Sequence, residues 1–251
     1  MNWVLDLDGV IWLADAPIPG SSAAVAALEA AGENLVFVTN NSHPTVQEYE
    51  AKLNAHGIDG AGRIVTSAMA AATLVEPGER VLLCAGPGTA EALTARGAVV
   101  VTSGAERAVD VVVVGFHRDF DYARMRAAAT AVRNGARLVA TNDDATYPTP
   151  DGPIPGAGSI LAGIERASSM RAVVAGKPYD AMAALVRARL GAEGIVVGDR
   201  PDTDGRFAKA LGYRFALVLT GVVTDASAVI DPTPDEIAPD LAALVAPRLK
   251  R

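Results

Sequence analysis

Short apolar runs alternate with longer helix-like segments along almost the whole of this 251-residue chain. The apolar runs include residues 3–5, 35–38, 81–84, 111–114, 137–140 and 195–197. The segments between them show the apolar spacing of helices and are long enough to cross over a sheet. Parallel strands need such crossover connections, and helices usually provide them. We therefore predict an α/β fold with a doubly wound parallel sheet.

A second α/β segment interrupts the first. A linker is predicted at Glu76-Pro77-Gly78, and the first pattern restarts near Ala172. We predict a core domain of residues 1–76 and 171–251, with an inserted α/β domain of residues 77–170. The insert contains a loop at residues 141–155 with four prolines. A loop of that length inside a compact domain is often functional.

Composition excludes several classes of protein. Half of the residues are hydrophobic, which is enough for a buried core, and the net charge is −7 with no basic stripe. This argues against nucleic acid as a partner. No apolar run approaches about 18 residues, so no membrane span is expected. Cys84 is the sole cysteine and no signal peptide is evident. We expect a protein of the reducing cytoplasm.

Polar side chains follow the predicted strands of the core domain. Asp6 and Asp8 come after the first strand, and Thr39 follows the second. Lys177 follows Val173-Val174, and Asp199 follows the strand at residues 195–197. Ligands of open parallel sheets bind beyond the carboxyl ends of the strands. These groups are therefore expected to meet at one edge of the sheet.

Asp6 and Asp8 lie two residues apart in an extended segment, so both carboxylates can face one site. Two close acids repel unless a cation neutralises them or one keeps a proton. A carboxylate beside a metal can attack phosphorus, and a protonated neighbour can give its proton to the leaving oxygen. Gly9 allows a tight turn after them. A strand-end turn with solvated acids explains the motif equally well when it is taken alone.

Lys177 and Asp199 point to a phosphate and a metal. Lys177 precedes a predicted helix, where a bound phosphate gains from both the lysine and the helix N-terminus. Asp6, Asp199 and one backbone carbonyl provide the oxygen ligands that Mg²⁺ prefers. Asp204 supports these ligands from behind or binds Lys177. The alternatives are an exposed loop lysine at position 177 and helix capping by Asp204 or Asp202, and for Asp202 we favour capping.

Thr39 and Asn40 follow an apolar strand and precede a predicted helix. A hydroxyl and backbone N–H groups at this place suit a phosphate oxygen. Thr is also an ordinary helix N-cap, and taken without the other three motifs these residues favour capping. Helix capping is similarly expected of Ser21 or Ser22 for the helix that ends near Ala31.

Taken in order, four segments resemble the haloacid dehalogenase (HAD) superfamily of phosphotransferases. They are Asp6-Leu7-Asp8-Gly9-Val10, Thr39-Asn40-Asn41, Gly176-Lys177-Pro178 and Gly198-Asp199-Arg200 with Thr203-Asp204. About 135 residues separate the second and third segments. That spacing and the full forms of the motifs are similar to the NagD and p-nitrophenylphosphatase branch, in which a large α/β cap is inserted there.

The resemblance implies a Mg²⁺-dependent phosphatase of small phosphate monoesters, such as sugar, glycerol or nucleotide phosphates. It implies that Asp6 forms an aspartyl-phosphate, and that Asp8 first protonates the leaving alcohol and then activates water. Asp6, Asp199 and the Asp8 backbone carbonyl would bind Mg²⁺, with Asp204 behind them. The transferring phosphoryl group would be held by Thr39, Asn40 and Lys177.

The insert would set specificity in such a protein. Phe116 and Tyr147 fall where relatives place substrate-facing side chains, and Asn41 belongs to the second motif. The expected partner is a small phosphorylated metabolite, and relatives often form homodimers through the cap. Aromatic residues at strand ends are also common in ordinary packing.

Two other functions remain open on the residues alone. The first is a silent phosphometabolite-binding protein, which would normally have lost an essential acid. The second is dehalogenase or phosphomutase chemistry on the same fold. Asp8 argues against dehalogenation, which does not need a second acid, and the large insert argues against the mutase arrangement.

Overall fold

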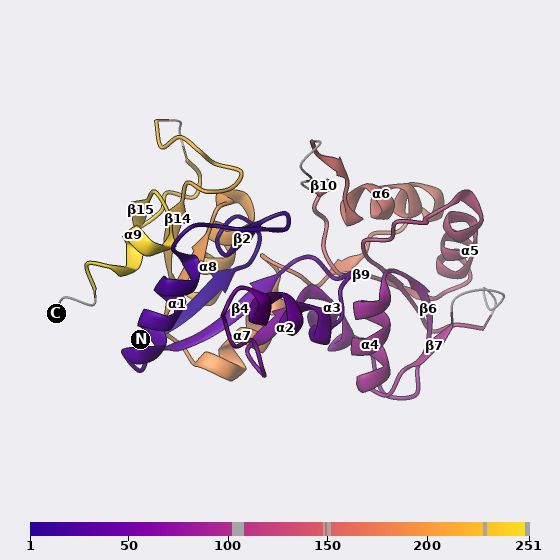
Figure 1. The fold of residues 1–251 in the computed structure, drawn as a ribbon. Coiled ribbons are helices and arrows are strands. Elements are labelled where there is room, and N and C mark those ends of the chain that lie inside the picture. Colours follow the sequence, from indigo (N-terminus) through magenta and orange to yellow (C-terminus); the bar gives the residue numbers. More distant parts are fainter. Residues whose placement is uncertain (102–107, 148, 150–151, 228–229, 249–251) are drawn as a thin grey trace. The chain divides into compact units, whose positions relative to one another are not determined.

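The computed structural model describes residues 1–101, 108–147, 149, 152–227 and 230–248 (Figure 1). Its backbone contacts divide the chain into two compact units. Unit 1 comprises Met1–Thr39, Gln47–Val65 and Lys177–Arg251, and unit 2 comprises Asn40–Val46 and Thr66–Gly176. Each unit is built around its own sheet, as expected for an α/β protein with two parallel sheets.

Unit 1 contains a six-stranded sheet in the order β15-β14-β13-β1-β4-β5. Its strands are β1 (Asn2–Asp6), β4 (Asn34–Thr39), β5 (Ile64–Thr66), β13 (Ile195–Gly198), β14 (Arg214–Val218) and β15 (Glu236–Ala238). The pairings of β1 with β4 and β13, of β13 with β14, and of β14 with β15 are all parallel. This is the parallel core that the alternating pattern predicted.

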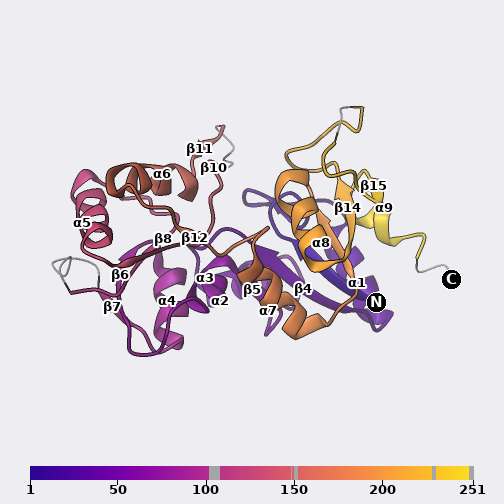
Figure 2. The same ribbon diagram turned by 180° about the vertical axis from the view of Figure 1, so that it is seen from behind.

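Helices cover this sheet. They are α1 (Ser21–Ala30), α2 (Val46–Ala55), α7 (Asp180–Leu190), α8 (Arg206–Leu211) and α9 (Leu241–Val245). Helix α1 packs with α9, and α7 packs with α8. Figure 2 shows α7 and α8 in front of the sheet, and Figure 1, seen from the opposite side, shows α1 in front. The sheet therefore has helices on both faces, which explains why its central strands are apolar throughout.

The register of the two central strands determines where the site forms. Trp3 pairs with Ile195 and Leu5 pairs with Val197, so β1 and β13 run side by side in the same direction. All four of these residues are at most 1% exposed. Their carboxyl ends, Asp6 and Gly198, consequently reach the same edge of the sheet.

Unit 2 contains a five-stranded sheet in the order β12-β9-β8-β6-β7, with every pairing parallel. Its strands are β6 (Arg80–Cys84), β7 (Val99–Val101), β8 (Val111–Val114), β9 (Arg137–Ala140) and β12 (Val173–Val174). Its helices are α3 (Ser67–Ala72), α4 (Pro87–Ala95), α5 (Tyr122–Arg133) and α6 (Ala157–Ser168). The very apolar run at residues 111–114 is a central strand, as its composition indicated, because parallel strands inside a sheet are buried on both faces.

Some local predictions were wrong. The run Val173-Val174 was grouped with the core domain, but β12 pairs with β9 of the second sheet. Neither Ser21 nor Ser22 caps α1: Gly20 is the N-cap, and the Ser21 hydroxyl donates to the Val10 carbonyl oxygen. The predicted domain boundaries near 77 and 171 stay a prediction.

Three features were not predicted at all. A hairpin of β2 (Trp12–Leu13) and β3 (Ala16–Pro17) follows the first motif. The long loop after β9 contains a second hairpin, β10 (Thr146–Tyr147) with β11 (Ile154–Pro155), while residues 148, 150 and 151 of this loop lie outside the described residues. A π-helical turn, η1 (Pro201–Gly205), precedes α8.

No helix among the described residues is both long enough and apolar enough to cross a bilayer.

The interior of unit 2 offers a stability test. Ile164 of α6 is fully buried in a cluster with Val112 and Leu138, whereas Ile154 in β11 is 37% exposed. We expect Ile164→Ala to destabilise the protein by about 2–5 kcal/mol, because the lost methyl groups leave a cavity. Ile154→Ala should cost less than about 1 kcal/mol. Urea unfolding of both variants measures this; equal losses would contradict the assignment of Ile164 to the core.

Candidate active site

Three strand ends of unit 1 deliver the predicted site residues. Asp6 is the last residue of β1, Thr39 is the last residue of β4, and Asp199 follows β13 directly. Lys177 comes from the loop between β12 and α7. Because these strands are neighbours and parallel, their carboxyl ends meet at one edge. The sequence analysis predicted that polar groups would meet at such an edge.

Lys177 joins two of the acids. Its Nζ lies 2.7 Å from Asp6 Oδ1 and 2.7 Å from Asp204 Oδ1, and its side chain is only 4% exposed. Burial alone lowers the pKa of Lys177, but the attraction of Asp204 and Asp6 outweighs it and raises that pKa above the usual range. The lysine is therefore a fixed cation at neutral pH. An exposed loop lysine, the alternative for position 177, is ruled out.

Burial dominates the acids of the same site. It raises the pKa of Asp6 well above the usual range; Lys177 opposes this shift, while Asp204, Asp199 and Asp8 add to it. Burial, with repulsion from Asp204, raises the pKa of Asp199 to about 7. In physical terms, carboxylates crowded into a poorly solvated site resist ionisation unless a cation joins them.

Asp6, Asp199 and Asp204 each offer an oxygen to such a cation, and these oxygens lie within 4.8 Å of one another. Asp199 Oδ2 accepts a hydrogen bond from the Val222 N–H at 2.6 Å. Asp199 Oδ1 is buried and has no hydrogen-bond partner within the described part of the chain. A buried carboxylate oxygen that accepts no hydrogen bond is the kind of atom that can coordinate a divalent cation. The donor set therefore fits Mg²⁺.

Glycines bring the backbone close to Asp199. A Cβ on Gly9 would lie 2.5 Å from Asp199 Cγ. Gly9 also has a φ of +84°, a backbone angle that residues with a side chain rarely adopt. A Cβ on Gly221 would lie 2.0 Å from Asp199 Oδ2. Glycine at these two positions keeps the carboxylate enclosed by backbone on two sides. The Asp8 carbonyl as a further metal ligand stays a prediction.

Asp204 is held from two directions. Its Oδ1 accepts from Lys177, and its Oδ2 accepts the Arg200 backbone N–H at 3.1 Å. The π-helical turn η1 directs Asp204 back toward β13, where a Cβ on Gly198 would clash with its carboxyl group. Of the two roles considered for Asp204, the contacts match binding of Lys177.

Asp202 does not cap α8. The N-cap of α8 is Gly205, with no side-chain cap, and the 61% exposed Asp202 carboxylate pairs with the Arg200 guanidinium at 3.4 Å. The predicted capping is therefore wrong. The sequence suggested an ordinary helix start near Asp202. The π-helical turn η1 occupies Pro201–Gly205 instead, so α8 begins at Arg206.

Asp8 lies just beyond β1, and a hydrogen bond from the Trp12 indole holds it. Nε1 of Trp12 lies 3.1 Å from Asp8 Oδ1. Burial raises the pKa of Asp8, and this hydrogen bond partly opposes the rise. Trp12 was not among the predicted site residues. Its position four residues after Asp8 was the available signal.

Thr39 and Asn40 do not cap α2, which begins at Val46. Thr39 is buried in unit 1, whereas Asn40 belongs to unit 2 and its amide donates to Asp144 Oδ2 at 3.1 Å. The Asn40 carbonyl oxygen accepts from Ser67 Oγ at 2.5 Å and from Asn142 Nδ2 at 2.7 Å. The segment after Thr39 is thus anchored to unit 2.

Within unit 2 the predicted substrate residues form a cluster. Phe116 and Tyr147 stack with centroids 5.2 Å apart, and the Asn41 amide donates to the Tyr147 hydroxyl at 3.4 Å. His43 meets Phe116 edge-on at 5.8 Å. The first three residues were predicted from the sequence, and His43 was not among the predicted site residues.

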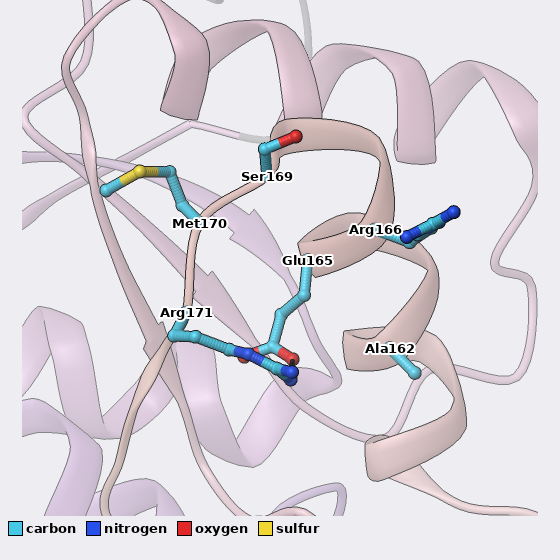
Figure 3. A pocket seen from close by; sticks show the side chains of 6 residues that line it. All are labelled: Ala162, Glu165, Arg166, Ser169, Met170 and Arg171. Atoms are coloured by element: carbon cyan, nitrogen blue, oxygen red, sulfur yellow. Dashed lines mark hydrogen bonds and ion pairs between the residues drawn. The ribbon is translucent and has the colours of Figure 1, made fainter.

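A separate hollow of about 370 Å³ lies at the end of α6 (Figure 3). It is lined by Ala162, Glu165, Arg166, Ser169, Met170 and Arg171. Glu165 and Arg171 pair with each other at 2.7 Å, so its charges are largely satisfied internally. Its lining includes none of the predicted site residues.

Two segments of the chain, one in each half, match known protein families. Residues 3–99 match the family described as haloacid dehalogenase-like hydrolase, and residues 174–244 match a second HAD-like hydrolase family. A D-glycerol 3-phosphate phosphatase of Mycobacterium tuberculosis is 38% identical over 87% of this chain, which spans 63% of that relative's length. An acid sugar phosphatase of Staphylococcus saprophyticus is 33% identical, covering 88% of this chain and 87% of its own.

Solved structures agree in fold over nearly the whole chain. A p-nitrophenyl phosphatase from Archaeoglobus fulgidus superposes with a TM-score of 0.91 at 30% identity and covers 98% of both chains. A glycerol phosphate phosphatase from Mycobacterium tuberculosis, in complex with magnesium, gives 0.86 at 36% identity over 97% of this chain and 76% of its own. The chain therefore belongs to the haloacid dehalogenase-like hydrolases of the NagD and p-nitrophenylphosphatase type, and it is a HAD-type phosphatase, a phosphoric monoester hydrolase.

Proposed function

We propose that the protein hydrolyses small phosphate monoesters in a Mg²⁺-dependent reaction through an aspartyl-phosphate on Asp6. The observation that carries this proposal is the buried cluster in which Lys177 binds Asp6 and Asp204 while Asp199 keeps an unpartnered oxygen. Such a cluster combines a nucleophile, a fixed cation and a metal ligand at one strand edge.

In the first step, a carboxylate oxygen of Asp6 attacks phosphorus as the bond to the leaving oxygen breaks. Asp8 gives its proton to that oxygen, so the product leaves as a neutral alcohol. Lys177, with Thr39 and Asn40 as further donors, stabilises the negative charge on the three non-bridging oxygens. The phosphoryl group is then carried by Asp6 as an acyl phosphate.

In the second step, Asp8 accepts a proton from water as the water oxygen attacks the same phosphorus. The bond between phosphorus and the Asp6 oxygen breaks, which releases inorganic phosphate and restores the carboxylate. Asp8 thus ends the cycle protonated and ready for the next ester. Asp8 can serve first as an acid and then as a base because it loses a proton in the first step and gains one in the second.

Asp6, Asp199 and the Asp8 backbone carbonyl would hold the Mg²⁺ ion, with Asp204 behind them. When bound, the ion neutralises the crowded carboxylates and the charge of the phosphate. Burial raises the pKa values of Asp6 and Asp199, so these two acids ionise more readily beside a cation. Their ionisation would therefore favour binding of the metal ion.

Specificity is proposed to come from the inserted cap domain, residues 77–170. Phe116 and Tyr147, joined by Asn41 to the second motif, form an aromatic and polar surface suited to a sugar, glycerol or nucleotide group. The similarity to a D-glycerol 3-phosphate phosphatase and to an acid sugar phosphatase supports this range of substrates. A homodimer formed through the cap and a cytoplasmic location complete the proposal.

The nucleophile is tested by Asp6→Asn. We expect p-nitrophenyl phosphate turnover to fall about 1,000-fold or more, because an amide cannot form the acyl phosphate. Asp202→Asn is a matched control on an exposed acid and should keep wild-type turnover. Wild-type activity in Asp6→Asn would refute the covalent mechanism.

Metal dependence is tested by chelation and by thermal unfolding. EDTA should abolish turnover, and added Mg²⁺ should restore it. Mg²⁺ should also raise the melting temperature of the metal-free protein by several degrees, since a ligand that binds only the folded state stabilises it. Asp199→Asn should lose this shift, and Asp202→Asn should keep it. An equal shift in both variants would place the ion elsewhere.

A substrate panel tests the monoester class. Glycerol 3-phosphate, sugar phosphates and nucleoside monophosphates should release phosphate, and bis(p-nitrophenyl) phosphate should react at least about 100-fold more slowly. A diester has only two non-bridging oxygens for the donors of Thr39, Asn40 and Lys177. The order of kcat/KM within the panel identifies the preferred leaving group. Comparable diester turnover would contradict the proposed phosphoryl site.

A further inference from the structure

The backbone after β1 turns sharply and returns Trp12 to Asp8. The Leu7 carbonyl oxygen accepts from the N–H groups of Ile11 and Trp12, at 2.9 and 3.2 Å. The Gly9 N–H donates to the Trp12 carbonyl oxygen at 2.7 Å. These bonds close a tight loop between β1 and the β2–β3 hairpin, so Trp12 lies beside the acid that precedes it by four residues.

The indole of Trp12 is fixed in place. It is 1% exposed, and the Lys52 ammonium lies 4.4 Å from the centroid of its ring. The same ammonium donates to the Ala14 carbonyl oxygen at 2.7 Å, which ties α2 to the hairpin. The His56 ring lies 6.0 Å from the Trp12 ring. A buried ring in contact with a cation and a second ring has little freedom to rotate, so its N–H keeps one direction.

That direction matters for Asp8. The Trp12 N–H donates to Asp8 Oδ1 at 3.1 Å. An indole nitrogen only donates, so Oδ1 acts as an acceptor whether the carboxyl group is charged or neutral. The carbonyl oxygen of a neutral carboxyl group is a better acceptor than its hydroxyl oxygen, so this hydrogen bond favours the proton of Asp8 on Oδ2. A carboxyl group without this donor would distribute its proton between both oxygens and rotate more freely.

We propose that Trp12 is a positioning residue that fixes the Asp8 carboxyl group for proton transfer to the leaving oxygen. This inference rests on the proposed general-acid role of Asp8. The Lys52 ammonium, 4.4 Å from the centroid of the ring, helps to hold the indole in place. The contribution of Trp12 is then greatest for substrates that need the proton most, namely alkyl phosphates with strongly basic leaving oxygens. p-Nitrophenolate departs with little protonation, so its ester needs the acid far less.

A purely structural role for Trp12 predicts something different. Loss of ring packing would lower activity equally for every substrate, because fewer molecules would be correctly folded. The ratio of kcat/KM for an alkyl and an aryl phosphate cancels such a loss. It also reports only steps up to departure of the leaving group, so a slower second step does not enter it.

The experiment compares Trp12→Phe with Trp3→Phe. Trp3 is equally buried, and its indole donates to Glu33 at 3.3 Å, so both variants lose one ring nitrogen and one hydrogen bond. kcat/KM is measured for glycerol 3-phosphate and for p-nitrophenyl phosphate with Mg²⁺. We expect Trp12→Phe to lower the first value by about 10-fold or more and the second by less than about threefold. Trp3→Phe should leave the ratio of the two unchanged.

A second variant covers the case in which Trp12→Phe folds poorly. Replacement of Trp12 by 3-benzothienylalanine exchanges the N–H for sulfur and keeps the size of the ring system, and it should give the same selective loss. An unchanged ratio in either folded variant overturns the role of Trp12. Wild-type protein that hydrolyses neither ester overturns the proposed function itself, so the two failures are distinguishable.

Discussion

A buried ammonium between two buried carboxylates organises this protein. Lys177 contacts Asp6 and Asp204, residues that lie 171 and 27 positions away in the chain. Each of the three is costly to bury alone, and removing one partner of a buried ion pair typically costs about 3–5 kcal/mol. The same contacts that hold the nucleophile therefore link the first strand, the end of the insertion and the last motif. Stability and catalytic geometry depend on one set of charges.

Two of the four places where the chain passes from one unit to the other fall within the motifs that are expected to hold phosphate. Unit 1 gives way to unit 2 between Thr39 and Asn40, and unit 2 gives way to unit 1 between Gly176 and Lys177. Within unit 2 the two crossing points touch, because a Cβ on Gly176 would lie 2.5 Å from Asn40 Oδ1. A glycine is therefore required where the two crossings meet. These two passages lie next to Thr39 and Lys177, which are proposed to hold the phosphoryl group.

Apolar runs predicted the sheets because parallel strands that are buried on both faces consist of nearly continuous hydrophobic residues. They also predicted Asp6 and Asp199, since strand ends of a parallel sheet converge. The two residues Val173-Val174 say nothing about which sheet they join, and that pairing was assigned wrongly. Trp12 and His43 were missed for a related reason. Their roles come from side chains that meet only after the loops close, and no periodic pattern records such contacts.

The charges of the site support the proposal of a metal ion and a separate proton carrier. Lys177 supplies one positive charge to the three carboxylates of Asp6, Asp199 and Asp204, so their full ionisation in a buried site is unfavourable. In the proposed mechanism a divalent cation offsets this charge and lets Asp6 act as a carboxylate. Asp8 is proposed to carry a proton at the same pH. Its carboxyl group accepts a hydrogen bond from the Trp12 indole, whereas the Asp6 carboxylate pairs with Lys177. The proposed nucleophile and the proposed acid are thus two aspartates two positions apart in the chain and distinguished by their partners.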